Sequence, residues 1–319
     1  MQAYLDFERP IAELEGRVVE LRRLAAQDSA MQIDDEVVRL ESRAQALLAE
    51  TYAKLTPWHK TLVARHQARP HFLDYAAQLF TEFTPLAGDR LYAEDPAVIS
   101  GLGRFRGRAV AIIGQEKGDD TKSRLAHNFG MARPEGYRKA QRLFQLAERF
   151  KLPVITFADT PGAYPGVGAE ERGQAEAIAR ATDACLMLGV PFVTIVIGEG
   201  MSGGALGIAV ANRVYMLEHA IYAVISPEGC ASILWRSAEK AQDAAAAMRI
   251  TAQDLLELKV IDGIVREPVG GAHRAPAEAI SAVGETIVHA LAEMDGLSPA
   301  ELRRQRRGKY LAMGRNLGG

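Results

Sequence analysis

The sequence has few cysteines, few aromatic residues and no long apolar run. Its 319 residues include two cysteines, Cys185 and Cys230, too few for a disulfide framework or an all-cysteine zinc site. The 7 histidines show no metal-ligand spacing, so no metal site is predicted in this chain. No stretch approaches the ~18 apolar residues of a membrane-spanning helix, and the N-terminus MQAYLDFERP does not resemble a signal peptide. We therefore expect a cytoplasmic, reduced protein with no membrane segment.

Neither sign of charge dominates the sequence. There are 38 lysines and arginines against 40 aspartates and glutamates, which gives a formal net charge of −2. Because non-specific binding to nucleic acid needs a large positive excess, this balance does not support it as the main activity. Apolar residues make up 48% and charged residues 24% of the chain, as in ordinary globular proteins. The 29 glycines exceed the usual share of ~7%, which first suggests a role for the backbone.

Two helical stripes precede the rest of the chain. Apolar residues recur at helical spacing over residues 11–24 and 33–47, with the polar stretch QDSAMQIDDE between them. This pattern predicts a helical hairpin, or two long helices, packed on the protein's own body or on a partner. Prolines then interrupt the pattern, and the character of the sequence changes. We predict a helical N-terminal extension and linker over residues 1–85, followed by a second domain over 86–319 with a helical C-terminal tail.

The second domain alternates short β-branched runs with amphipathic stretches. Buried strands are predicted at 108–114, 153–159 and 191–198, and shorter ones at 214–217 and 221–226. Helices are predicted at about 134–151 and 170–188, and a further helical region over about 229–259. This alternation is typical of an α/β fold in which helices cover a largely parallel sheet.

Glycine-rich loops follow the second and third of these strands. Residues 159–168 read DTPGAYPGVG, and residues 198–205 read GEGMSGGA. In α/β sheets, ligands bind beyond the carboxyl ends of the strands. Gly203 and Gly204 are expected to begin a helix that continues as ALGIAVA, where the first backbone amides have no partner within the helix. Two such amides would form an oxyanion hole; the alternative is that the glycines only allow close packing of strand and helix.

The same loop fits two other short patterns. Residues 198–203 match the dinucleotide-binding pattern G-x-G-x-x-G, with Glu218 about twenty residues further on. Residues 200–204 match G-x-S-x-G, in which Ser202 would be a nucleophile served by Asp262 and His273. One short loop cannot be all three kinds of site, and from these patterns alone the choice stays open.

Several charged residues stand near the predicted strand ends. Asp159 and Glu199 each end a strand, where they would serve as acid or base or would cap the following turn. A group of basic residues near the end of the first predicted strand would face a phosphate-bearing ligand or form a solvated surface: Lys117, Lys122, Arg124, Arg138 and Lys139.

Longer blocks of the sequence carry a resemblance to one family. They include ITFADTPGAYPGVGAEERGQAEAIAR, IGEGMSGGALGIAVANRVYML and YAVISPEGCASILWRSAEKA. These blocks resemble the α subunits of bacterial acetyl-CoA carboxylase carboxyltransferases, and the similarity is collinear from about residue 4 to residue 310. It implies an α/β fold of the crotonase type, a ββα spiral in which backbone amides stabilise a thioester enolate.

The resemblance also implies an activity and its partners. Family members transfer the carboxyl group of carboxybiotin, carried on a separate biotin carboxyl carrier protein, to acetyl-CoA, which gives malonyl-CoA for fatty acid biosynthesis. The active site lies between the α subunit and a zinc-bearing β subunit in an α2β2 heterotetramer, so zinc is expected only on the partner. ATP is consumed by another subunit, the biotin carboxylase.

Site residues are carried over from the family by position. Gly203 and Gly204 match the pair whose amides polarise the biotin carbonyl, and Gly162 and Ala163 match a neighbouring wall. The other residues expected to bind carboxybiotin are Tyr164, Gly166, Gly200 and Ser202, and the candidates for the CoA phosphates are Lys117, Lys122 and Arg124. On this reading Ser202 is a loop residue. The alternatives are a serine hydrolase that uses Ser202 and a non-catalytic scaffold subunit.

Overall fold

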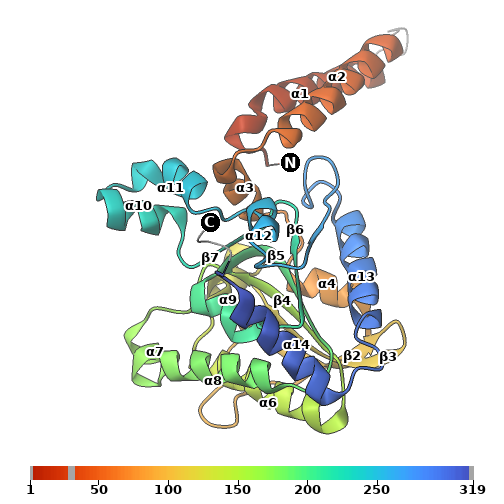
Figure 1. Cartoon of the computed structure of the whole chain (residues 1–319). Helices are drawn as coiled ribbons and strands as arrows, with labels where there is room; N and C mark the ends of the chain where they lie inside the picture. Colours follow the sequence, from red (N-terminus) through yellow and green to blue (C-terminus); the bar gives the residue numbers. More distant parts are fainter. Residues whose placement is uncertain (1–2, 28–32, 316–319) are drawn as a thin grey trace.

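The N-terminal part of the chain is a helical hairpin that projects from the body in a computed structural model, which describes residues 3–27 and 33–315 (Figure 1). After a short 3-10 helix, η1 (Asp6–Glu8), the hairpin consists of α1 (Arg9–Gln27) and α2 (Asp34–Ala53). Its seam is the apolar stripe seen in the sequence, including Val18, Val37 and Leu40. Both predicted helices are confirmed, whereas half of the predicted polar break between them, residues 28–32, lies outside the described residues.

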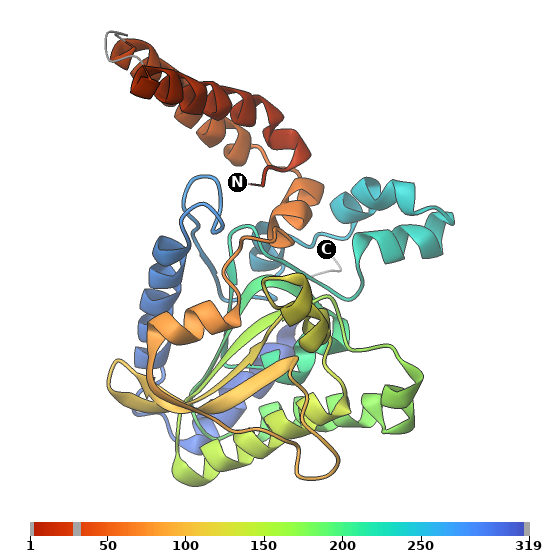
Figure 2. The same ribbon diagram turned by 180° about the vertical axis from the view of Figure 1, so that it is seen from behind.

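The base of the hairpin packs on the protein's own body. Tyr52 at the end of α2 lies in a buried cluster with Val63 of α3 (Pro57–Ala64). Arg274 of the body donates to Glu15 at 2.8 Å and to the fully buried Glu8 at 3.3 Å. These buried contacts hold the base of the hairpin against the body, while α1 and α2 extend away from it (Figure 2).

The body is built on one sheet whose described strands follow the order β1-β2-β3-β4-β5-β6-β8, with β7 paired to β5. The first three strands pair antiparallel, and β3, β4, β5, β6 and β8 pair parallel. The strands are β1 (Phe80–Pro85), β2 (Val98–Phe105), β3 (Arg108–Gln115), β4 (Val154–Thr160), β5 (Phe192–Met201), β6 (Arg213–Leu217), β7 (Ile221–Ala223) and β8 (Gly263–Val265). All five predicted strands are confirmed, although β7 ends earlier than expected. The sequence did not predict β1, β2 and β8.

Helices cover both faces of this sheet (Figure 1). Successive side chains of a strand point to opposite faces, and Phe157 of β4 packs on Phe72 of α4 (Phe72–Leu79), while Phe192 of β5 packs on Phe144 of α6 (Pro134–Phe150). The face of α4 also carries α13 (Pro276–Ala292), and the face of α6 carries α8 (Gln174–Met187) and α9 (Ser202–Ala209). The last helix, α14 (Pro299–Ala312), lies against α8.

Shorter helices connect these elements. The predicted helix 170–188 is interrupted at Gly173, where φ is +81°, and forms α7 (Val167–Glu171) and α8. The region 229–259, predicted as helical, is broken at Arg236 and Arg249, both at positive φ. It contains α10 (Pro227–Trp235), η3 (Ala238–Lys240), α11 (Ala241–Ala247) and α12 (Ala252–Glu257). The segment after β3 forms α5 (Thr121–Ala126) and η2 (Asn128–Gly130).

Two segments assigned to the extension in the sequence contribute to the body. The helix α4 packs on the sheet, and β1 extends its antiparallel edge by pairing with β2. Both segments therefore pack on the body, and the division between residues 85 and 86 stays a prediction. Among the described helices, none combines the length and apolar character needed to span a membrane.

Candidate active site

The two glycine-rich segments meet at the carboxyl ends of β4 and β5, but the second, predicted as a loop over residues 198–205, is the end of β5 followed directly by α9. The helix α9 begins at Ser202, directly after β5, so Gly203 and Gly204 lie in its first turn as expected. A Cβ atom added to Gly204 would lie 2.6 Å from the carbonyl carbon of Gly162 and 2.7 Å from the nitrogen of Ala163. Contact this close with another backbone requires glycine at position 204.

The loop after β4 is held by its own threonine. The Thr160 hydroxyl donates to the carbonyl of Gly162 at 2.7 Å and accepts from the Gly162 amide at 3.1 Å. Gly162 itself has a φ of +139°, which L-amino acids rarely adopt. The turn therefore presents backbone, with no side chain, toward the start of α9.

The start of α9 has free hydrogen-bonding capacity and a positive potential. The first amides of a helix have no acceptor within it and lie at the positive end of the helix dipole. Ser202, Gly203 and Gly204 occupy that turn, with Ser202 exposed and Gly204 buried. Such amides can stabilise negative charge that develops on a carbonyl oxygen.

An apolar cavity of about 360 Å³ lies beside this turn. Ser202 and Leu206 of α9 form one side, and Tyr222 and Ala223 of β7 form another. The remaining lining comes mainly from α12 and its flanks: Val224, Met248, Arg249, Leu255, Leu258 and Val260. A volume in this range accommodates a small, largely apolar ligand whose polar group reaches the amides.

The other predicted binding residues extend the walls of these loops. The Tyr164 carbonyl accepts from Gln174 at 2.9 Å, and its ring lies under the guanidinium of Arg133. Gly166 packs against the ring of Tyr164, and Gly200 packs against the ring of Tyr222. The structure thus gives these glycines a packing role. Tyr164 and Gly166 belong to the same loop as Gly162, which contacts Gly204.

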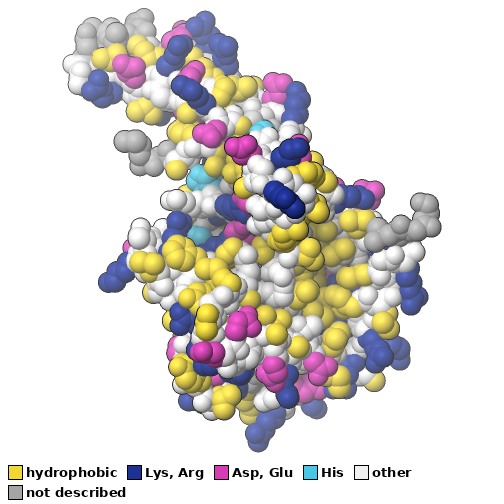
Figure 3. Space-filling view, turned by 90° about the vertical axis from the view of Figure 1, so that its left-hand side faces the viewer, with side chains coloured by type: hydrophobic (Ala, Val, Ile, Leu, Met, Phe, Trp, Pro, Cys, Tyr) yellow, Lys and Arg dark blue, Asp and Glu magenta, His cyan; other side chains and the backbone are white. Residues whose placement is uncertain are grey.

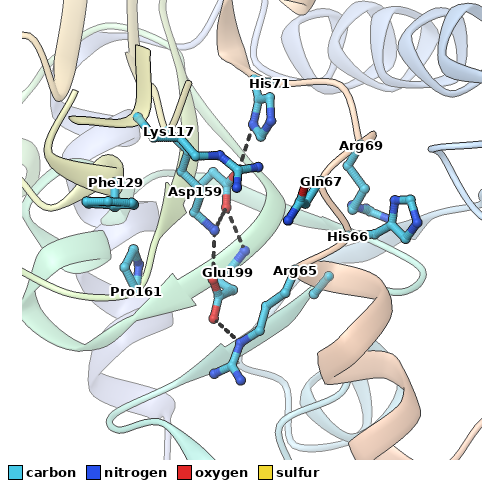
Figure 4. Close-up of a pocket in the computed structure, with 12 residues that line it drawn as sticks. Arg65, His66, Gln67, Arg69, His71, Lys117, Phe129, Asp159, Pro161 and Glu199 are labelled. Atoms are coloured by element: carbon cyan, nitrogen blue, oxygen red, sulfur yellow. Dashed lines mark hydrogen bonds and ion pairs between the residues drawn. The ribbon is translucent and has the colours of Figure 1, made fainter. Parts of the chain in front are cut away.

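A buried network of charges lies at the ends of β3, β4 and β5 (Figure 4). The Lys117 ammonium is 2.6 Å from Asp159 Oδ1 and 2.7 Å from Glu199 Oε2. Arg65, at the end of α3, donates to Glu199 at 2.7 Å, and the imidazole of His71 is 3.8 Å from Asp159. The network lines a second cavity of about 210 Å³.

The network keeps its carboxylates ionised. Burial by itself raises the pKa of Asp159, but Lys117 and His71 outweigh burial and lower it to about 2. Burial likewise opposes ionisation of Glu199, whose pKa is nevertheless lowered by Lys117 and Arg65. Asp159 Oδ1 also accepts from the Glu199 amide at 2.9 Å, so the two strand ends are joined directly. The two carboxylates thus tie strand ends together, and neither acts as a simple turn cap.

These contacts change the interpretation of the basic residues. Lys117 is fully engaged by two carboxylates, which argues against a role for it in holding a CoA phosphate. Lys139 is buried and paired with Glu94, and Arg138 donates to the carbonyl of Arg172. Lys122 is exposed on α5, and Arg124 lines the second cavity, so these two stay predictions for phosphate binding.

The serine-hydrolase arrangement is not assembled. Asp262 accepts from the Val214 amide at 2.7 Å and pairs with Lys309. The His273 ring stacks on His66, neither of its nitrogens has a hydrogen-bond partner, and burial together with His66 lowers its pKa to about 3. Within the described residues, no hydrogen bond joins Ser202 to either of them.

The Ser202 hydroxyl gives a direct test of that alternative. A serine nucleophile contributes on the order of 10⁶-fold to turnover, whereas a loop hydroxyl contributes little. We expect Ser202→Ala to lower turnover less than about tenfold, because the backbone amides at the start of α9 are retained. Labelling of Ser202 by a fluorophosphonate probe, lost in Ser202→Ala, would contradict this expectation.

The dinucleotide-binding interpretation is not supported either. The Glu199 side chain within the pattern is held by Lys117 and Arg65, and the Glu218 carboxylate accepts from the Glu267 amide at 3.2 Å. The pattern begins within β5, which ends at Met201 and lies between β4 and β6 in the sheet, whereas the dinucleotide motif opens the first βαβ unit.

Sequence reasoning missed Arg65, His71 and Gln115. Gln115 and Lys117 have the i, i+2 spacing of residues on one face of a strand, which could have indicated that both side chains reach the neighbouring strand ends. Arg65 and His71 belong to a segment with no recognisable motif, and only the fold brings them to this edge of the sheet.

Comparison of the sequence with known proteins identifies a family and individual proteins to which this chain is similar. The family described as "Acetyl co-enzyme A carboxylase carboxyltransferase-like" matches residues 4–314. The acetyl-coenzyme A carboxylase carboxyl transferase subunit alpha of Methylobacterium nodulans is 66% identical over 317 residues, covering 99% of this chain and 100% of that protein. The protein of the same name from Sinorhizobium fredii is 63% identical with the same coverage.

Solved structures share the fold at low sequence identity. Transcarboxylase 12S, solved with methylmalonyl-coenzyme A and methylmalonic acid bound, has a TM-score of 0.58 at 19% identity, over 72% of this chain and 42% of that one. A chain of a Pseudomonas malonate decarboxylase hetero-tetramer in complex with coenzyme A has a TM-score of 0.55 at 19% identity, over 66% and 84%. At this identity the likeness concerns the fold, which is that of the crotonase type.

Proposed function

Because the chain belongs to the α-subunit family of acetyl-CoA carboxylase carboxyltransferases, we propose that it transfers the carboxyl group of carboxybiotin to acetyl-CoA, forming malonyl-CoA, together with a β subunit. The observation that carries this proposal is the first turn of α9. There Gly203 and Gly204 present backbone amides beside a glycine loop and an apolar cavity.

The residues present suit biotin chemistry. The bicyclic ring of biotin is compact and largely apolar apart from its ureido group, which matches an apolar cavity of about 360 Å³ lined in part by Ser202, the first residue of α9. When bound, carboxybiotin supplies the carboxyl group that is transferred. Gly203 and Gly204 would donate hydrogen bonds to the ureido oxygen, and Gly162 and Ala163 would form the adjoining wall.

Backbone amides are suited to this reaction because they act on developing charge. Amides fixed at a helix start need no reorganisation as negative charge grows on the oxygen, and one such donor contributes on the order of 10²–10³-fold to kcat. The chemistry requires no side-chain nucleophile, in agreement with the absence, within the described residues, of a hydrogen bond from Ser202 to Asp262 or His273.

A partner is needed to complete the site. The thioester carbonyl of acetyl-CoA must be polarised by donors of its own, and we assign these, and the zinc site, to the β subunit of an α2β2 assembly. Exposed apolar side chains support such a partner: Val224 beside the cavity and Ile233, Leu234 and Trp235 on α10 are 40–78% exposed. Figure 3 shows hydrophobic side chains spread over the face that includes α10. Exposed apolar surface of this kind marks protein interfaces.

The remaining subunits are proposed from the chemistry. Carboxybiotin would arrive on a biotin carboxyl carrier protein after ATP-dependent carboxylation by a biotin carboxylase. We place the reaction in the cytoplasm, where malonyl-CoA would feed fatty acid biosynthesis.

Reconstitution tests the proposal. The purified chain alone should be inactive, and mixed with its β partner it should convert malonyl-CoA and biocytin to acetyl-CoA and carboxybiocytin. Each subunit alone serves as the control, and acetyl-CoA formation is followed with a coupled spectrophotometric assay. Absence of transfer by a stable, correctly assembled α2β2 complex would refute the proposed function.

A further inference from the structure

Gln115 connects the end of β4 with the start of α9 in the candidate site. It is the last residue of β3 and is fully buried. Its Nε2 donates to the carbonyl of Gly204 at 2.7 Å, and its Oε1 accepts from the amide of Asp159 at 3.1 Å. One side chain therefore reaches from β3 to the first turn of α9 and to the end of β4.

The sheet is irregular where Gln115 makes these bonds. The pairing of β4 with β5 shifts between Ala158 and Thr160, so that Ala158 lies opposite Val196 while Thr160 lies opposite Gly200. The pairing of β3 with β4 ends at Gly114 and Phe157, and beyond it the amide of Asp159 donates to the Gln115 side chain. Such irregularities next to sites re-aim the chain locally.

The hydrogen bond from Gln115 to Gly204 acts on a close contact between Gly204 and the loop after β4. Gly204 rests against the Gly162–Ala163 peptide without room for a Cβ atom. Gln115 fixes Gly204 through its carbonyl and fixes the loop of Gly162 through Asp159, three residues earlier. Tyr137 adds a second, longer bond of 3.4 Å to the same Gly204 carbonyl. Gln115 thus holds both sides of this contact.

The energetic cost of burying Gln115 is met by these two bonds. A buried amide that lacks partners costs on the order of 1–3 kcal/mol, and both functional atoms of this amide are satisfied. An apolar side chain of similar size would pack here without that requirement, but it would leave the Gly204 carbonyl and the Asp159 amide without this common partner.

We propose that Gln115 is a positioning residue for carboxyl transfer, which sets the direction and separation of the Gly203 and Gly204 amides relative to the Gly162–Ala163 wall. This inference rests on the proposed function. Gln115 touches no substrate in it; it acts through the backbone of Gly204. A displacement of about 1 Å in a catalytic group can cost about 100-fold in rate, so loss of this support should lower kcat.

The experiment compares three variants in complex with the β partner. Gln115→Met keeps the length of the side chain and removes both bonds. Tyr137→Phe removes only the longer bond to Gly204. The control is Thr156→Val, because the buried Thr156 hydroxyl donates to Ile208 of the same helix at 2.9 Å, four residues beyond Gly204.

We expect Gln115→Met to lower kcat about 10–100-fold while KM for malonyl-CoA and for biocytin changes less than about threefold. Tyr137→Phe should show a smaller loss of kcat, and Thr156→Val should stay within about twofold of the wild type. Thermal unfolding of each complex is measured alongside, and kcat is expressed per folded complex. A merely structural role would lower the melting temperatures of Gln115→Met and Thr156→Val alike and leave kcat per folded complex unchanged.

Two results would overturn the inference: a kcat for Gln115→Met within twofold of the wild type, or equal losses of kcat in Gln115→Met and Thr156→Val. The wild-type complex, assayed in parallel, separates this failure from that of the proposed function. If the wild-type complex is active and the kcat of Gln115→Met lies within twofold of it, only the positioning role is refuted. If the wild-type complex is inactive, the proposed function on which this role rests is refuted.

Discussion

Replacing Gly204 with alanine should lower carboxyl transfer by at least about 100-fold, the size of effect seen when an oxyanion donor is lost. A single methyl group at this position would lie 2.6 Å from the Gly162 carbonyl carbon and 2.7 Å from the Ala163 nitrogen, so one backbone must move. Both neighbours are backbone atoms, and no flexible side chain can yield. The first turn of α9 would therefore shift away from the loop that it faces, and its amides would lose alignment.

A second helical glycine offers a matched control. Gly308 of α14 has no atom within 4 Å of an added Cβ, so Gly308→Ala should keep full activity and slightly stabilise its helix. Gly203→Ala should fall between the two, because its added Cβ would meet only the Ile178 side chain, at 3.3 Å. The measurement is kcat for the malonyl-CoA and biocytin reaction, with circular dichroism to establish folding. Activity of Gly204→Ala equal to that of Gly308→Ala would contradict the close-contact argument.

Lys117→Met should destabilise the protein by about 3–5 kcal/mol at neutral pH, the typical cost of removing one partner of a buried ion pair. The ammonium of Lys117 is the shared partner of Asp159 and Glu199, whose side chains are each 6% exposed. Without it, two neighbouring carboxylates would remain buried with the Arg65 guanidinium and the His71 imidazole as their remaining partners. The measurement is the free energy of unfolding from urea titrations of the wild type and the variant.

The pH dependence of this loss has a definite sign. In the wild type the pKa values of Asp159, about 2, and of Glu199 lie below those of unfolded chains, so their contribution is present above about pH 4–5 and is lost only as pH falls toward the folded values. In Lys117→Met, the cation that opposes the effect of burial is missing, so the pKa values of Asp159 and Glu199 both rise. The variant therefore gains stability relative to the wild type as pH is lowered from 7 to 5.

An exposed lysine provides the comparison for this substitution. Lys54 pairs with Glu50 on the surface of α2, where the side chains are 73% and 64% exposed. Lys54→Met should leave the free energy of unfolding nearly unchanged, because water screens such pairs. If Lys117→Met were equally mild at pH 7, the buried network would not be the stabilising element described above.

The parts of the fold that could be predicted from the sequence are those that depend on patterns among a few neighbouring residues. The continuous β-branched runs of β3, β4 and β5 and the helical stripes of α1, α2 and α6 appear in the sequence at nearly their observed bounds. The strand β2 reads VISGLGRF, and its glycines obscured the strand pattern. Gly101 of β2 packs against the backbone of Thr84 in β1, so this strand is defined by its neighbours in the sheet.

By itself the sequence determined the fold class, the family and the position of Gly203 and Gly204 at the start of a helix, because strand and helix periodicity and helix-start signals act over a few neighbouring residues. Only the tertiary structure decided what the side chains around those glycines do. Lys117, predicted to meet a phosphate, pairs with Asp159 and Glu199, and Gln115 joins Gly204 to Asp159. The physical reason is that these contacts join residues 40 or more positions apart along the chain, and they depend on which strands are neighbours and in what register they pair.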